Sequence, residues 1–230
     1  MYCLPLVRGS LLSELENWIP RAPQWLQRPN PLVLVSSCEV WAGPSGLPSS
    51  VRMIFDRPGV LSSGAEGDTD PYEMSLKGEH GLNIARQAGI SLGKGAVRAA
   101  KNIKPGPNEN ASLKVKESIL TLAHRNNPAK TSQVGILAAV INDKIALVTI
   151  PGEPFIQHQL DLRAKSPLPD TFLLGLAYCG AGTPFAIYIP TAQNVKEGGY
   201  GAVEASFLEP EAGAKMVEAG VAAIKELLNE

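Results

Sequence analysis

The pattern of apolar and polar positions predicts a central β-hairpin in the second half of the chain. Residues 134–141 and 144–150 are two apolar runs, and the Asn142-Asp143 pair between them is a two-residue hairpin signal. Both runs are apolar almost throughout, so we expect this hairpin to lie in the middle of a sheet. Residues 113–122 alternate apolar with polar side chains, which predicts another strand.

Helical periodicity is clearest in residues 211–229, where one stripe is apolar throughout. That stripe consists of Ala214, Val217, Val221, Ile224 and Leu228. Residues 81–103 also have a helical pattern, in spite of three glycines that are each unfavourable by about 1 kcal/mol relative to alanine. We expect the small residues of this helix to allow close packing on a sheet. Residues 153–165 can form a further helix.

Short apolar runs predict the remaining strands, at residues 32–35, 51–55, 171–177 and 185–189. This mixture of helices and strands predicts an α/β fold, a layered domain with a mixed β-sheet flanked by helices. The beginning of the chain fits poorly, because four prolines fall within twelve residues. We therefore divide the chain into an irregular segment, residues 1–50, and a folded domain, residues 51–230.

Composition and charge exclude several classes of protein. The 230 residues carry 21 Lys and Arg against 22 Asp and Glu, a formal net charge of -1. This balance argues against a protein that binds nucleic acid or anionic membranes by bulk electrostatics. No run of 18 apolar residues occurs, so we expect no transmembrane segment. No signal peptide is visible, which makes the cytoplasm the default expectation, and the three cysteines form no C-x-x-C pair.

The first candidate for chemistry is the acidic loop, Ser-Gly-Ala-Glu-Gly-Asp-Thr-Asp-Pro-Tyr at residues 63–72. It places Glu66, Asp68 and Asp70 within five positions, and its glycines let the backbone approach a ligand closely. One interpretation is a loop that binds a metal ion or a polar substrate. The other is a turn rich in Asp and Pro, held by hydrogen bonds between side chains and backbone, and spacing alone favours it.

Two further residues have two interpretations each. Glu153 follows a buried strand and a Pro-Gly pair, and ligands of α/β folds usually bind at the ends of strands. Alternatively, its charge stabilises the N-terminus of the next helix. Tyr188 lies on a short apolar strand, where a core or cross-strand aromatic is the ordinary role. The three histidines, His80, His124 and His158, have no spacing typical of a zinc enzyme.

Three motifs, taken in order, resemble the neutral/alkaline (non-lysosomal) ceramidases and their bacterial relatives. They are GAEGD-x-x-P at 64–71, ALVTIPGEPF at 146–155 and YIPTAQNVKEGGY at 188–200. The resemblance covers the C-terminal half of that family's N-terminal catalytic domain. It implies a hydrolase that uses one zinc ion to cleave the amide bond of N-acyl-sphingosine, and therefore a lipid-like amide as substrate. Members of the family are often secreted.

The resemblance also implies roles for individual residues. Glu153 and Tyr188 correspond to two of the four zinc ligands. Asp70 stands where the family has a serine, so Asp70 and Asp68 are the candidate catalytic residues, with Asp70 as a general base beside a water molecule. The residues of the substrate loop would be Gly64, Ala65, Gly67 and Tyr200.

One departure from the family determines what we expect of this chain. The two zinc-binding histidines of the family precede the acidic loop, but residues 1–63 contain no histidine. A carboxylate and a phenol are too few for a catalytic zinc, which keeps three protein ligands. We therefore expect a truncated ceramidase-like amidase that is inactive as this chain. The alternatives are a complete enzyme with other ligands, a non-catalytic remnant, and a module that binds a cation or polar ligand through the acidic loop.

Overall fold

The computed structural model describes residues 34–37, 60–69, 78–102, 111–178 and 188–230. In chain order, its elements are β1 (Leu34–Ser37), β2 (Val60–Ser63), α3 (Gly78–Asn102), β3 (Leu113–His124), β4 (Asn127–Ile141), β5 (Ile145–Thr149), β6 (Glu153–Pro154), α4 (Ile156–Lys165), β7 (Asp170–Leu174), β8 (Tyr188–Ile189), α5 (Ala192–Glu197), the π-helix η1 (Tyr200–Glu204) and α6 (Ala212–Asn229).

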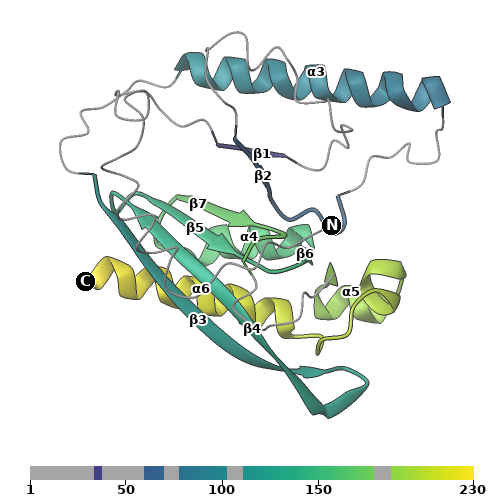
Figure 1. Cartoon of the computed structure of the whole chain (residues 1–230), viewed down its shortest axis with the longest axis vertical. Helices are drawn as coiled ribbons and strands as arrows, with labels where there is room; N and C mark the ends of the chain where they lie inside the picture. The colour runs from purple at the N-terminus through teal and green to yellow at the C-terminus, as the bar shows by residue number, and fades with distance from the viewer. Residues whose placement is uncertain (1–33, 38–59, 70–77, 103–110, 179–187) are drawn as a thin grey trace.

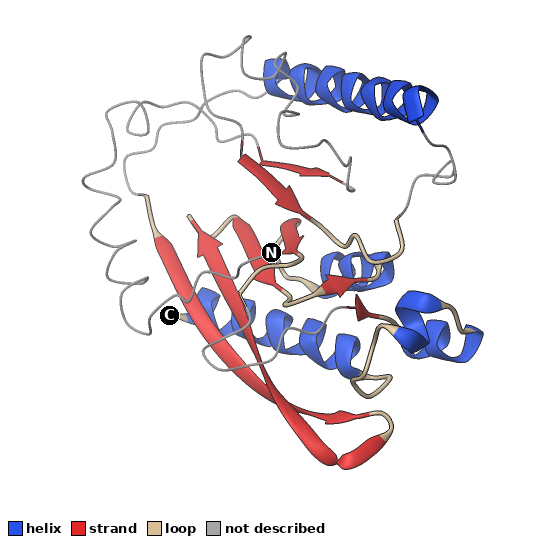
Figure 2. Ribbon diagram, turned by 45° about the vertical axis from the view of Figure 1, so that its right-hand side comes forward, coloured by secondary structure: helices blue, strands red, loops and turns tan. Residues whose placement is uncertain are grey.

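The main sheet has four strands in the order β3-β4-β5-β7. The first two pairs are antiparallel, and β5 pairs with β7 in parallel, so the sheet is mixed. In both views α4 and α6 lie against one face of this sheet, whereas α3 lies apart from it, beyond the parallel β1–β2 pair (Figure 1, Figure 2). The close packing on a sheet expected of residues 81–103 is therefore not seen among the described residues, and a Cβ atom at Gly89 or Gly95 would meet nothing within 4 Å. The prediction of a layered α/β fold with a mixed sheet flanked by helices is confirmed.

The hairpin predicted at the centre of the sheet is confirmed as well. β4 and β5 are the two inner strands of the sheet, and Asn142 and Asp143 in the turn between them have positive φ angles of 53° and 52°. The turn is one residue longer than predicted, because Ile141 pairs with Ile145 and Lys144 lies in the turn. Such a turn suits Asn and Asp, because these residues tolerate the left-handed conformation better than most others do. The amide oxygen Oδ1 of Asn142 also accepts a hydrogen bond from the backbone N–H of Ser112, 2.8 Å away.

The hydrophobic core lies between one face of the sheet and α6. Alternate residues of β4 point into it, and Val134, Ile136, Ala138 and Val140 are each at most 1% exposed. α6 approaches the sheet closely at Gly220, where a Cβ atom would stand 2.6 Å from a methyl group of Val148. The helix predicted at residues 211–229 is confirmed, and Val217, Val221 and Ile224 of the predicted stripe are buried. The stripe itself was partly wrong, because Ala214 is exposed and Leu228 only partly buried, whereas Met216 and Leu227 are buried instead.

Several predicted elements differ in their bounds. The strands predicted at residues 113–122 and 134–141 are longer, because β3 ends at His124 and β4 begins at Asn127. The helix expected from residue 153 begins only at Ile156, because Glu153 and Pro154 pair with β8 instead. The strand expected at residues 171–177 ends at Leu174. The strand predicted at residues 51–55 and most of the N-terminal segment lie outside the described residues, so the division at residue 50 stays a prediction. No helix in the described part of the chain is both long and apolar enough to cross a membrane.

Candidate active site

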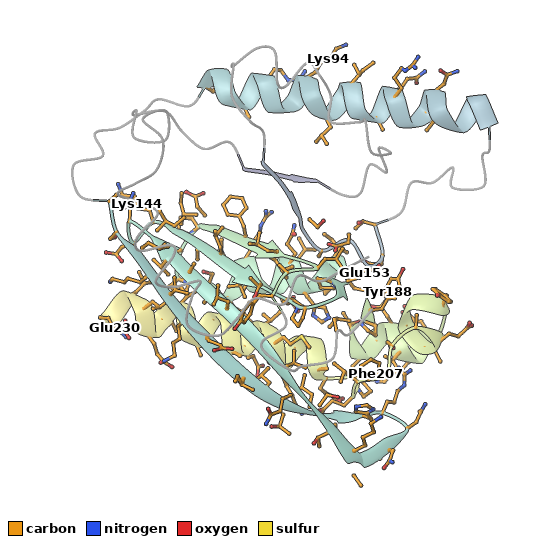
Figure 3. The ribbon with its side chains drawn as sticks, in the orientation of Figure 1. Lys94, Lys144, Glu153, Tyr188, Phe207 and Glu230 are labelled. Carbon is orange, nitrogen blue, oxygen red and sulfur yellow. The ribbon has the colours of Figure 1, made fainter. Side chains whose placement is uncertain are left out.

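The two predicted zinc ligands lie side by side in a small parallel sheet. β6 pairs with β8, and the register places Glu153 opposite Tyr188 and Pro154 opposite Ile189. The backbone N–H of Phe155 continues the pairing by donating to the carbonyl of Ile189 at 3.1 Å. Figure 3 labels Glu153 and Tyr188 close together at one edge of the molecule. The structure thus brings together two residues that the resemblance pairs.

The end of β5 explains how Glu153 reaches this edge. The N–H of Ile150 donates to the carbonyl of Leu174 at 2.8 Å, so the pairing of β5 with β7 extends one residue further. The chain then turns at Gly152, whose φ of 114° is rarely adopted by residues with a side chain. The carbonyl of Gly152 accepts the N–H of Leu176 at 2.7 Å, which ties the turn to the segment after β7.

The described half of the acidic loop, residues 63–69, is bonded to β6 and α4 at three positions. Ala65 N–H donates to Oε1 of Gln159 at 3.1 Å, and Gly67 N–H donates to the carbonyl of Pro154 at 2.9 Å. Asp68 Oδ1 accepts the N–H of Ile156, the first residue of α4, at 2.6 Å. Asp68 therefore serves α4 as a cap side chain would, and its negative charge is favourable at that end of a helix.

Gly67 is the point of closest approach between the loop and β6. A Cβ atom at this position would stand 2.3 Å from the backbone oxygen of Glu153 and 2.8 Å from the Phe155 ring. Any side chain here would push the loop away from the backbone that carries Glu153. The glycine predicted for the substrate loop is thus required by packing.

The three carboxylates of the loop have different surroundings. Glu66 is buried, with only 5% of its surface exposed, and Gly175 packs directly against its carboxylate. Asp68 is exposed and bonded to α4, as described above. Asp70, the predicted general base, lies outside the described residues, so its role stays a prediction. Gly64 and Ala65 are buried beside Glu66.

Aromatic rings surround Tyr188. Its ring meets that of Phe155 edge-on at a centroid distance of 6.4 Å and that of Tyr200 at 6.0 Å, with interplanar angles of 90° and 77°. These T-shaped contacts suit the charge distribution of aromatic rings. Tyr200 itself is 66% exposed, so it stands at the outer rim of this aromatic group.

The two histidine side chains that the structure describes, those of His124 and His158, are each bonded through Nε2, and the buried Nδ1 of His158 has no hydrogen-bond partner among the described residues. His158 is 2% exposed on α4, and its Nε2 lies 3.2 Å from the carbonyl of Pro190. Burial lowers the pKa of the His158 imidazole below its usual value, although the Pro190 carbonyl and Asp161 act in the opposite direction. His124 lies on β3, where its Nε2 is 2.8 Å from the hydroxyl of Ser132.

The donor set at this edge falls short of a catalytic zinc site. Glu153 and Tyr188 offer a carboxylate and a phenol, and both are oxygen donors that zinc accepts. Among the residues that the structure describes, no group of three or more His, Cys, Asp or Glu side chains can hold a metal ion. Two donors are fewer than the three protein ligands of a catalytic zinc, so these residues do not complete such a site.

Comparisons with known proteins give no further guide to the site. A scan against models of protein families found no match, and a search of curated proteins found none either.

Two side chains that shape this edge were missed by sequence reasoning. Gln159 holds the acidic loop from α4, and Arg125, in the turn between β3 and β4, bonds the segment that carries Tyr200. Both contacts join residues far apart in the chain, so no local sequence pattern indicates them. The glycine pair before Tyr200 is a visible signal of the unusual backbone there, because Gly198 and Gly199 have φ angles of 89° and 101°.

Proposed function

We propose that this protein is part of a zinc-dependent amidase of the ceramidase type, in which Glu153 and Tyr188 provide two of the zinc ligands. The observation that supports the proposal is the register of β6 and β8, which sets these two residues directly opposite each other. Neighbouring residues in a parallel pair are close enough to bind one ion together. The substrate class that follows from the resemblance is a lipid-like amide.

The remaining residues of the edge suit such a substrate. A zinc ion bound here would polarise the amide carbonyl and lower the pKa of a bound water. Gly67 allows the acidic loop to pack directly against the backbone of Glu153, and this contact holds β6 in place. The edge-to-face rings of Tyr188 and Tyr200 offer an apolar wall, and the exposure of Tyr200 leaves it accessible to a hydrocarbon chain.

The incomplete donor set limits what this chain does unaided. With two protein ligands, we expect zinc to bind weakly and the amide bond of N-acyl-sphingosine to remain intact. Further nitrogen ligands would have to complete the site, and among the described residues no group of three or more His, Cys, Asp or Glu side chains comes together to supply them. Zinc binding can therefore be measured on this chain, although hydrolysis of the amide is not expected from it.

The test is a zinc titration of chelator-treated protein that carries no His-tag. The wild-type chain is compared by equilibrium dialysis with Glu153→Gln and Tyr188→Phe, and with Glu218→Gln as a control for an exposed carboxylate on α6. At saturating zinc, we expect one zinc ion per chain in the wild type and in the control, although the affinity is weak. Loss of a ligand should weaken binding by more than the roughly tenfold that loss of a supporting residue costs.

Free imidazole sharpens this experiment, because it can supply the missing nitrogen ligand. We expect imidazole to tighten zinc binding by the wild type but not by Glu153→Gln. A folded wild-type chain that binds no zinc, with or without imidazole, would overturn the proposal. Zinc or calcium binding that survives Glu153→Gln but disappears in Asp68→Asn would instead favour a cation-binding module built on the acidic loop.

A further inference from the structure

The guanidinium group of Arg125 bonds a single short segment of the chain. One terminal nitrogen, Nη1, donates to the carbonyl of Ala202 at 2.9 Å and to the hydroxyl of Ser206 at 3.1 Å. The other, Nη2, donates to the carbonyls of Val203 at 2.6 Å and Ser206 at 2.8 Å. All four acceptors are uncharged, so the cation acts here as a rigid set of donors.

Two of the acceptors, the carbonyls of Ala202 and Val203, belong to the π-helix η1, and the other two lie on Ser206, just after it. This π-helix is five residues long, and its characteristic hydrogen bond runs from the N–H of Ala205 to the carbonyl of Tyr200 at 2.9 Å. Carbonyls at the C-terminal end of a helix lack partners within the helix, and a nearby cation is favourable there. Arg125 supplies both the donors and the charge for the carbonyls of Ala202 and Val203.

The π-helix in turn packs against the predicted zinc ligand. A Cβ atom on Gly201 would stand 3.0 Å from the Tyr188 ring, so the backbone of η1 lies against that ring. Tyr200 adds its edge-to-face contact from the same element, while Phe155 contacts Tyr188 from β6–α4. The orientation of the Tyr188 phenol therefore depends on where η1 lies.

We propose that Arg125 is a positioning residue of the candidate site, which fixes η1 and thereby orients the Tyr188 ring beside Glu153. The link to zinc rests on the proposed function, in which Tyr188 is a ligand. The link from Arg125 to the Tyr188 ring rests only on the contacts given above. A rigid support of this kind is what a metal ligand on a two-residue strand needs, because supporting contacts fix ligand orientation.

The fold offers a way to remove the guanidinium without detaching the turn. The backbone N–H of Arg125 donates to the carbonyl of Phe207 at 2.9 Å, and His124 forms a β-bridge with Leu208. Glu209 adds two bonds to Ala123, one through its N–H and one through its side chain. These contacts do not involve the Arg125 side chain, so its variants should keep the fold.

The experiment uses the full chain labelled with 3-fluorotyrosine, in the wild type, Arg125→Ala and Arg125→Lys. The control is Lys130→Ala, which removes an exposed cation from the same hairpin. Fluorine NMR reports the surroundings of the five tyrosines. Tyr178→Phe, Tyr188→Phe and Tyr200→Phe assign the signals of these three, and Tyr178 is the internal reference because its hydroxyl bonds Glu117 on β3. Zinc affinity is measured in parallel, and circular dichroism checks that each variant is folded.

We expect Arg125→Ala to shift or broaden the signals of Tyr188 and Tyr200 but not that of Tyr178, and to weaken zinc binding roughly tenfold. Arg125→Lys should act in the same direction, because an ammonium group cannot reproduce four bonds in a planar fork. Unchanged Tyr188 signals in folded Arg125→Ala would overturn the positioning role. If the wild type binds no zinc, the proposed function fails, and the fluorine signals still decide whether Arg125 orients the ring.

Discussion

The core beneath α6 and the edge that carries Glu153 are built in different ways. The core uses long elements, since β4 and α6 run for 15 and 18 residues and bury one side chain after another. The edge uses strands of two residues and a loop bonded through single backbone contacts. Many small contributions therefore stabilise the core. At the edge, a few contacts each determine where one segment lies.

This difference separates stability from function in the molecule. A change in the core should lower the free energy of unfolding while the edge keeps its geometry in the molecules that remain folded. A change at the edge should cost less stability but disturb the relation of Glu153 to Tyr188. Stability and zinc affinity, measured together on the same variants, therefore test the comparison directly.

The largest effect is expected from Ile136→Ala. Ile136 is 1% exposed in the middle of β4, so truncation leaves a cavity among residues that cannot easily collapse. We expect the free energy of unfolding to fall by about 2–5 kcal/mol, measured by urea denaturation, with no change in zinc affinity below the transition. An equal loss of zinc affinity would show that the core and the edge are not separable.

Gly67→Ala should have a smaller effect on stability and a larger one on the site. The new methyl group would stand 2.3 Å from the backbone oxygen of Glu153, so either the loop or β6 must move. Overpacking of this kind costs about 1–3 kcal/mol, and we expect zinc affinity to fall with it. Gly95→Ala is the matched control, because a Cβ atom there meets nothing within 4 Å.

The same contrast explains which parts could be predicted from the sequence. The central hairpin followed from two apolar runs and Asn142-Asp143, because turn chemistry and strand pattern are local properties. The long helix at the C-terminus followed from its apolar stripe for the same reason. Elements of this length repeat their signal several times within the chain.

The edge gave weaker signals because each of its elements is short. β6 and β8 are too short to show an alternation of apolar and polar residues, and α5 was not predicted at all. Asp68 was predicted as a catalytic residue, and its bond to Ile156 depends on a fold that brings two distant segments together. The pairing of Glu153 with Tyr188 came from the resemblance, since nothing in their spacing indicates it.

The smallest effect, a dependence of stability on pH, tests the region where the core and the edge meet. His158 lies on α4, packed against Gly213 of α6 on one side and bonded to the carbonyl of Pro190, next to β8, on the other. Burial lowers its pKa in the folded chain, so the unfolded chain binds a proton at a higher pH than the folded chain does. The neutral imidazole therefore contributes stability above the unfolded pKa, and this contribution is lost as pH falls through the folded value.

We expect the free energy of unfolding to decrease below about pH 6.5, with a slope from this group of at most about 1.4 kcal/mol per pH unit. His158→Gln should flatten the profile below about pH 6.5, although it costs stability at every pH. Ile136→Ala serves as the control, because it lowers stability without removing a titratable group and should leave the slope as it is in the wild type. If instead His158→Gln keeps the wild-type slope, the junction does not sense pH through this imidazole. A separate measurement, the zinc affinity of the wild type and of His158→Gln across the same pH range, shows whether protonation of His158 also affects zinc binding through Tyr188. Tyr188 lies two residues before Pro190 in the chain.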